Sequence, residues 1–194
     1  MNLLQRRRAM MGVREETSDV LYELHNKSCT SYETINTGVK LFSRDQDWSI
    51  AYDFTWTLSD VSTQTEFLRI NQENSSALLM VIKRGGSGGG NALLVQYNSG
   101  EYRADLKVRA TSRFRFVLSH AKNSNTINCV VRKGTETPIT GSISKPFLVS
   151  TKTASLGYGT STTGLPTGLT INHVVIYNRV LSSDEINTFL GVST

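Results

Sequence analysis

The sequence predicts an all-β fold, an antiparallel two-sheet sandwich or jelly roll that ends in one short helix. Residues 48–57 alternate strictly between bulky apolar side chains and small or polar ones, a pattern typical of a half-buried strand. Roughly ten to twelve short runs of this kind are separated by Gly, Asn, Ser or Asp, as in sandwiches and jelly rolls. No helical crossover separates any of the runs, which argues against a parallel sheet.

The run WSIAYDFTWT is the clearest strand. Its large apolar side chains occupy the even-numbered positions from Trp48 to Trp56, so we expect one face to be buried and the other to face solvent. Further strands are expected at DVLYELH, TEFLRI, SALLMVIK, ALLVQY, EYRADLKV, RFRFVLS, TINCVVR, TPITGSI and LTINHVVIYN.

The chain is expected to end in a capped helix of about two turns. Ser182 and Glu185 are spaced as a capping box, which predicts a helix that starts near Ser183, and Gly191 is a natural stop. The apolar side chains of one helix face are Ile186, Phe189 and Leu190. A helix this short is unstable alone, so its apolar face must dock on the rest of the protein.

Length and composition favour a single soluble domain. A chain of 194 residues is long enough for one well-buried core. No apolar run approaches the ~20 residues of a membrane span, so no membrane association is expected. The start of the chain, MNLLQRRRAMMGVREE, lacks the apolar stretch and cleavage site of a secretory signal.

Cysteine and histidine give little indication of a metal site. Cys29 and Cys129 could pair, but two thiols do not make a disulfide framework, and we expect both to be reduced and buried. The sequence has no CxxC motif, and His25, His120 and His173 are scattered along it. This pattern gives little support to a transition-metal site.

The net charge of +5 does not by itself indicate an anionic partner. Much of it is spread over strand surfaces, as in RFRFVLSH, where Arg113 and Arg115 are expected to lie on a solvated strand face. The single basic run, Arg6 to Arg8, is too short for a nucleic-acid interface, and no stacking motif accompanies it. No nucleic-acid partner is expected.

The glycine-rich segment GGSGGG, residues 85–90, is the stretch most like a ligand loop. A phosphate-binding loop would need Lys-Ser or Lys-Thr and a helix after the glycines, but another strand follows here. We therefore interpret it as a flexible hairpin loop.

The chain divides into an N-terminal arm, residues 1–17, and a sandwich domain, residues 18–194. The arm has no strand alternation, and we expect it to be helical or irregular and to pack on its own domain or on a neighbouring subunit. Its predicted docking residues are Leu3, Leu4, Arg6, Arg7, Arg8, Met10 and Met11.

The two ends of the sandwich region resemble laminin-G-like, concanavalin-A-like lectin/glucanase domains. The resemblance rests on residues 32–38 and 47–54 near the start and on INHVVIYNRVLSSDEINTFL at the end. It implies a jelly-roll sandwich whose terminal helix folds back over apolar surface and a sheet end. Cys29 and His173 depart from the family pattern, and His173 stands where an Asp often precedes the last strand. Neither departure threatens the fold, but the one at His173 weakens any transfer of the family's calcium ligands to this chain.

The arm is similar to the leaders of small structural proteins of gut bacteriophages, through the segment MNLLQRRRAMMG. This resemblance implies a virion decoration protein that is made in the host cytoplasm, displayed on the virion surface and attached to other virion proteins through residues 1–17. It also allows a homo-oligomer.

We expect a binding protein that is not an enzyme. Glucanases of this superfold use an ExDxxE pattern on one strand, and serine hydrolases use GxSxG; the sequence has neither. The interpretation is a virion protein whose exposed domain adheres to host cell-surface glycans. A free-standing bacterial carbohydrate-binding module and a degenerate glycoside hydrolase are the alternatives.

Candidate glycan-binding residues are aromatic and amide side chains near loops, and candidate calcium ligands are two loop carboxylates. The glycan candidates are Tyr97, Tyr102, Tyr158, Asn98 and Asn123. The calcium candidates are Asp45 and Asp47; no other cofactor is expected. Each has a structural alternative, since the tyrosines could fill the rim of the sandwich and the aspartates are ordinary turn residues.

Overall fold

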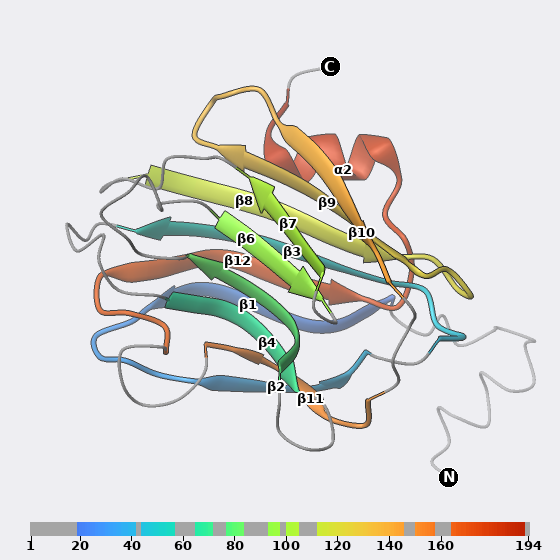
Figure 1. The fold of residues 1–194 in the computed structure, drawn as a ribbon. Helices are drawn as coiled ribbons and strands as arrows, with labels where there is room; N and C mark the ends of the chain where they lie inside the picture. Colours follow the sequence, from blue (N-terminus) through green and yellow to red (C-terminus); the bar gives the residue numbers. More distant parts are fainter. Residues whose placement is uncertain are drawn as a thin grey trace, which may run out of the picture.

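The computed structural model describes residues 19–41, 44–56, 65–71, 77–83, 93–97, 100–104, 112–145, 150–157 and 164–192. These residues form twelve strands and one helix (Figure 1). The strands are β1 (Val20–Ser28), β2 (Ile35–Lys40), β3 (Trp48–Trp56), β4 (Thr65–Asn71), β5 (Ala77–Lys83), β6 (Leu93–Tyr97), β7 (Gly100–Ala104), β8 (Ser112–His120), β9 (Thr126–Lys133), β10 (Ile139–Ser144), β11 (Thr153–Leu156) and β12 (Leu169–Tyr177). The helix is α2 (Ser183–Leu190).

The strands make two sheets that stack face to face, which confirms the predicted sandwich (Figure 1). One six-stranded sheet, here called the first sheet, has the order β1-β12-β3-β8-β9-β10. The second has the order β2-β11-β4-β5-β6-β7. The paired strands run antiparallel throughout the described residues. The last strand, β12, lies between the edge strand β1 and β3, so the two ends of the sandwich domain meet in the first sheet.

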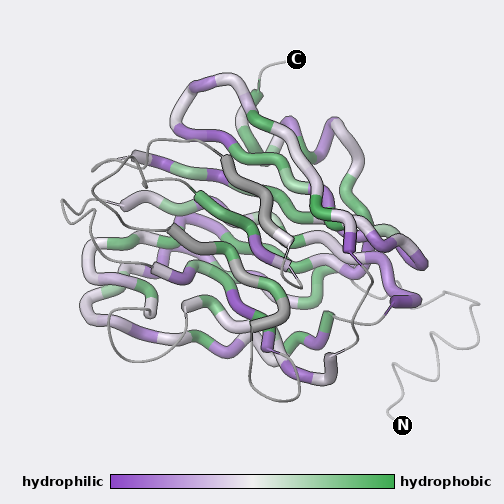
Figure 2. Tube along the Cα trace, in the orientation of Figure 1, coloured by the Kyte–Doolittle hydropathy of each residue, from purple (hydrophilic) through white to green (hydrophobic). Residues whose placement is uncertain are grey.

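The core lies between the sheets and is rich in aromatic side chains. Phe54 of β3 stacks on Phe67 of β4 with ring centroids 4.4 Å apart, which joins one sheet to the other. Tyr52 and Phe116 meet edge to face at 5.2 Å within the first sheet. Figure 2 shows hydrophobic and hydrophilic residues alternating along several strands. This alternation places one apolar face of each sheet toward the other, as the sequence predicts.

Strand β3 differs from the prediction, because it is buried on both faces. The outward-facing residues Ser49, Ala51 and Asp53 are all buried, although the alternation predicts exposure. The reason is α2, which packs on the outer face of the first sheet; Leu190 of the helix shares a cluster with Ala51 and Val117 of the strands. A period-two pattern cannot indicate that a helix from elsewhere in the chain will cover the polar side.

Helix α2 begins and ends as predicted. The Ser182 hydroxyl accepts a hydrogen bond from the Glu185 N–H, and the Glu185 carboxylate accepts one from the Ser182 N–H, which completes the capping box. Gly191 ends the helix in the left-handed conformation at φ 69°. The helix covers a face of the first sheet, whereas the edges of that sheet are β1 and β10.

The two cysteines agree with their prediction. Cys29 and Cys129 are free and buried as expected, and burial raises the pKa of each thiol to about 12.

Strands β5 and β6 pair as an antiparallel hairpin around the glycine-rich segment, which itself lies outside the described residues. Residues 1–17 also lie outside them. In the described part of the chain, no helix has the length and apolar character required to cross a bilayer.

Candidate functional site

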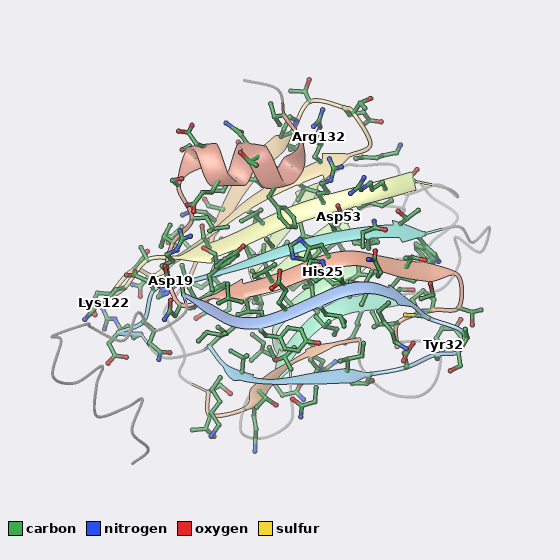
Figure 3. The ribbon with its side chains drawn as sticks, turned by 180° about the vertical axis from the view of Figure 1, so that it is seen from behind. Asp19, His25, Tyr32, Asp53, Lys122 and Arg132 are labelled. Atoms are coloured by element: carbon green, nitrogen blue, oxygen red, sulfur yellow. The ribbon has the colours of Figure 1, made fainter. Side chains whose placement is uncertain are left out.

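Polar side chains gather on the outer face of the first sheet, where β12, β3 and β8 lie side by side (Figure 3). Asp53 is the cross-strand partner of Arg115 on one side and of His173 on the other. Arg113 lies two residues before Arg115 and therefore faces the same way. Three adjacent strands thus place an acidic, two basic and an imidazole side chain on one surface.

A β-bulge in β12 adds an amide to this surface. The register of β12 against β3 shifts between Ile171 and His173, so Asn172 is an extra residue in the strand. Both Asn172 and His173 face outward as a result, while Ile171 and Val174 point into the core. Bulges commonly re-aim a side chain next to a functional site.

The buried Asp53 carboxylate organises the cluster. Arg113 Nε donates to Asp53 Oδ1 at 2.8 Å and to Oδ2 at 3.1 Å, and Arg113 Nη2 also donates to Oδ2. Arg115 Nε donates to Oδ2 at 3.1 Å. Asn172 Nδ2 donates to Oδ1 at 2.9 Å and to the hydroxyl of Thr55 at 3.0 Å. One carboxylate therefore fixes the orientation of two guanidinium groups and one amide.

These contacts also set the protonation of the cluster. Burial of the Asp53 carboxyl raises its pKa, but the hydrogen bonds from Arg113, Asn172 and Arg115 outweigh that effect and hold the pKa below its ordinary value. The contact with Asp53 in turn raises the pKa of Arg113. At neutral pH the cluster therefore carries two positive charges and one negative charge.

Helix α2 is fixed beside the cluster by two arginines. Arg115 Nη1 and Arg132 Nη1 both donate to the carbonyl oxygen of Leu190, the latter at 2.8 Å. These cations satisfy a carbonyl at the helix C-terminus, where positive charge is stabilising. Gly191 suits this position because its φ of 69° is one that residues with a side chain rarely adopt, and a Cβ there would also crowd Arg115 Nη1 at 2.8 Å. Figure 3 shows Arg132 near the end of α2 and Asp53 on the sheet beside it.

Sheet and helix together form a cleft of about 540 Å³. Its residues are Asn26, Asp53, Arg113, Arg115, Asn172 and His173 from the sheet and Thr188, Phe189 and Gly191 from the helix and its end. The floor is cationic and rich in hydrogen-bond donors. The half-buried Phe189 ring supplies an apolar surface at one wall.

The cleft retains donors for a ligand. The Arg113 side chain is 49% exposed and that of Arg115 is 15% exposed, whereas Asp53 is only 6% exposed. Among the described residues, Arg113 Nη1 and Arg115 Nη2 have no hydrogen-bond acceptor. The geometry therefore suits an anionic group, such as a carboxylate, bound by a guanidinium fork.

A second cavity of about 340 Å³ also borders α2 and shares Thr188 and Phe189 with the first. It is lined by Tyr177, Leu181, Asp184, Glu185, Thr188 and Phe189. The carboxylate of Glu185 is committed to Arg179, at 2.6 and 2.9 Å, and to the helix cap. This cavity lacks the convergent donors of the first, so we regard the arginine cleft as the candidate site.

Of the five predicted glycan-binding residues, the structure fully describes two, Tyr97 and Asn123. Tyr97 is fully buried in the core, so its prediction as an exposed sugar platform is wrong. Asn123 lies in the turn between β8 and β9, with φ 63° and its N–H bonded to the Arg44 carbonyl at 2.7 Å. Tyr102 pairs with Val95 through the backbone of β7, but its side chain lies outside the described part. The remaining candidates, Tyr158 and Asn98, lie outside it as well.

The predicted calcium ligands lie shortly before β3, Asp45 in a turn and Asp47 immediately before the strand. Asp47 Oδ1 accepts a hydrogen bond from the Lys122 N–H at 2.6 Å, which ties this segment to the β8–β9 turn. In the described part of the chain, neither Asp45 nor Asp47 belongs to a group of three ligands that could hold a metal ion. The docking residues of the arm, Leu3, Leu4, Arg6, Arg7, Arg8, Met10 and Met11, lie outside the described residues.

Sequence reasoning missed the arginine cleft. It assigned Arg113 and Arg115 to a solvated strand face, but both arginines bind the buried Asp53. A buried carboxylate in a strand is rarely unpaired, so Asp53, the one charged residue of the run 48–57, was the available signal.

Comparison with known proteins agrees with the fold. No protein-family profile matches the sequence, and no curated protein sequence matches it. Among solved structures, the CBM40 domain of the Ruminococcus gnavus IT-sialidase bound to α2,6-sialyllactose superimposes with a TM-score of 0.61 at 12% identity, covering 89% of this chain and 100% of that one. The same domain bound to α2,3-sialyllactose gives 0.60 at 13% identity, with the same coverage.

Whole sialidases contain a similar domain. A leech intramolecular trans-sialidase matches with a TM-score of 0.57 at 13% identity, covering 90% of this chain and 28% of that one. The present chain thus spans less than a third of that enzyme. At these identities the likeness shows the fold: an antiparallel, two-sheet, lectin-like β-sandwich of the kind found in the carbohydrate-binding modules of sialidases.

Proposed function

We propose that this protein is a carbohydrate-binding module that holds an acidic glycan in the cleft between α2 and strands β12, β3 and β8. One observation carries the proposal: Arg113 and Arg115 surround a single buried carboxylate, Asp53, on the floor of an open cleft of about 540 Å³. The excess positive charge and the uncommitted guanidinium donors favour a ligand that brings a carboxylate of its own.

The other groups in the cleft suit a sugar. The Phe189 ring provides an apolar wall of the kind that packs against the C–H face of a pyranose. The Thr188 hydroxyl and the Asn172 side-chain oxygen can bond sugar hydroxyls. A few fixed polar groups beside one aromatic surface are typical of sites that bind small polar ligands.

The structural neighbours support the class of ligand. The Ruminococcus gnavus domain occurs in complexes with α2,3- and α2,6-sialyllactose, and the sialic acid unit of these glycans carries a carboxylate. We therefore take sialyllactose as the first acidic glycan to test. The role proposed is binding rather than catalysis.

The test compares an acidic glycan with its neutral parent. Isothermal titration of the full chain with α2,3-sialyllactose, α2,6-sialyllactose and lactose is expected to show binding of the sialylated sugars and much weaker binding of lactose. Arg113→Gln is expected to weaken sialyllactose binding roughly 10- to 100-fold, because a hydrogen bond to a charged group contributes about 1.5–3 kcal/mol.

Lys122→Gln is the matched control, since it removes the same charge from the exposed β8–β9 turn, away from the cleft. It should leave affinity almost unchanged at physiological salt, where exposed charges are screened. Equal affinity for lactose and sialyllactose, or equal losses in the two variants, would refute a carboxylate-binding cleft.

We also propose, from the leader sequence alone, that residues 1–17 attach the sandwich to other virion proteins. Deleting these residues should leave a soluble, folded domain that keeps its glycan affinity but no longer joins the particle or oligomer. Loss of folding on deletion would contradict this division of roles and make the arm a part of the core.

A further inference from the structure

Two histidines that are 148 positions apart in the sequence lie side by side on the outer face of the first sheet. His25 of β1 and His173 of β12 are direct cross-strand partners. Their rings stack with centroids 4.0 Å apart and an interplanar angle of 15°. Glu23 lies two residues before His25 and therefore faces the same way. The sequence suggests that the histidines are scattered, but the pairing of β1 with β12 brings His25 and His173 together.

The three side chains point their ligand atoms at one place. The Nε2 atoms of His25 and His173 lie 2.9 and 2.8 Å from Glu23 Oε1. All three atoms lie within 4.8 Å of one another. Bonds of about 2.0–2.2 Å to a metal ion, at angles near 90–110°, place neighbouring ligand atoms roughly 3 Å apart. The two N···O distances are therefore close to those of a coordinated set, and the two nitrogens lie within 4.8 Å of each other.

We propose that Glu23, His25 and His173 form a binding site for a divalent transition-metal ion, with zinc as the first candidate. Two imidazole nitrogens and one carboxylate oxygen are a donor set that zinc accepts, and copper and nickel also favour imidazole. Calcium and magnesium are disfavoured, because they prefer sets made of oxygen atoms.

The surroundings orient the ligands and leave room for the ion. The Phe189 ring lies 5.8 Å from that of His173, so His173 has an aromatic neighbour on α2 as well as on β1. The side chains of His25, Glu23 and His173 are 55%, 45% and 30% exposed. An ion can therefore reach them from solvent, and water can complete its coordination.

The Glu23 carboxylate carries the negative charge that a metal ligand needs. Hydrogen bonds from His173 and His25 hold the pKa of Glu23 below its ordinary value, so the group is ionised at neutral pH. The same hydrogen bonds offer a metal-free account of the cluster, in which both imidazoles simply donate to Glu23. Direct measurement of metal binding separates the two accounts.

The experiment uses full-length protein without a histidine tag, titrated with zinc chloride by calorimetry. We expect one zinc ion per chain, and weaker binding at lower pH because protons compete for the imidazole nitrogens. His25→Gln, His173→Gln and Glu23→Gln should each weaken binding by at least about tenfold, since even groups that merely orient a ligand contribute roughly 10- to 100-fold. Glu136→Gln, at an exposed turn carboxylate, is the control and should bind as the parent does.

Two further readouts make the result decisive. The imidazole NMR signals of His25 and His173 should shift on addition of zinc, whereas those of the buried His120 should not. The cobalt-loaded protein should lack a thiolate charge-transfer band. Absence of zinc binding, binding that survives both histidine substitutions, or a thiolate band that points to the cysteines would overturn the proposal. None of these outcomes depends on whether the protein binds a glycan.

Discussion

The two faces of strands β3 and β8 differ in composition and in role. The inner face carries Phe54 and Phe114, which are fully buried and stack on each other, and Phe54 also stacks on Phe67 of the second sheet. The outer face of the same strands carries Asp53, Arg113 and Arg115 around an open cleft. Successive residues thus alternate between packing and binding, so single substitutions can separate stability from ligand affinity.

The largest expected effect is on the inner face. Phe54→Ala should lower the free energy of unfolding by about 3–5 kcal/mol, because it removes a large side chain from the centre of the aromatic core and leaves a cavity. Urea unfolding monitored by fluorescence measures this change. A loss below about 1 kcal/mol would show that Phe54 does not link the two sheets as described.

On the outer face, Asp53→Asn should lower the free energy of unfolding by about 2–3 kcal/mol. The loss is smaller than for an unpaired charge in a fully buried core, because the Arg113 side chain is half-exposed and water can solvate it. The effect should depend on pH. The folded-state pKa of Asp53 lies below its unfolded value, so its contribution is present above about pH 4 and is lost as the pH falls through the lowered folded pKa.

The measurement is the free energy of unfolding of the parent protein and of the Asp53→Asn variant at pH values from about 2 to about 7. This range includes the ordinary Asp pKa of about 3.9. The difference between them should be constant near neutrality and shrink in acid. A difference that stays the same over the whole range would mean that Asp53 does not act through its charge.

The smallest expected effect is that of Tyr52→Phe. The Tyr52 hydroxyl is buried on the inner face, without a hydrogen-bond partner among the described residues, and desolvation raises the pKa of the phenol well above its ordinary value. Removing the hydroxyl should change stability by less than about 1 kcal/mol and could increase it, because an unsatisfied buried group is lost. A clear destabilisation would reveal a partner for that hydroxyl.

The fold could be predicted because its signals are local. The alternation from Trp48 to Trp56 depends on residues two apart, and the capping box of Ser182 and Glu185 depends on residues three apart. The structure confirms the strand and the helix at these positions, although the outer face of the strand is buried and not exposed.

The candidate site could not be predicted, because it depends on register between distant segments. Asp53 meets Arg115 only because β3 pairs with β8 in one particular register, and it meets Asn172 only because of a bulge in β12. The position of α2 then decides that this polar face is a cleft and not an open surface. His25 and His173 became neighbours for the same reason, through pairing of the first and last strands.

The measurement that tests the central claim most directly is an NMR titration of isotope-labelled protein with sialyllactose. If the glycan occupies the outer-face cleft, the largest shifts should fall on the Arg113 Nε–H, the Asn172 side-chain amide and the backbone amides of Phe189 and Gly191. Shifts confined to β6 and β7 or to the turn at Asn123, with none in the cleft, would contradict glycan binding in the cleft and would instead indicate a binding site at the loops.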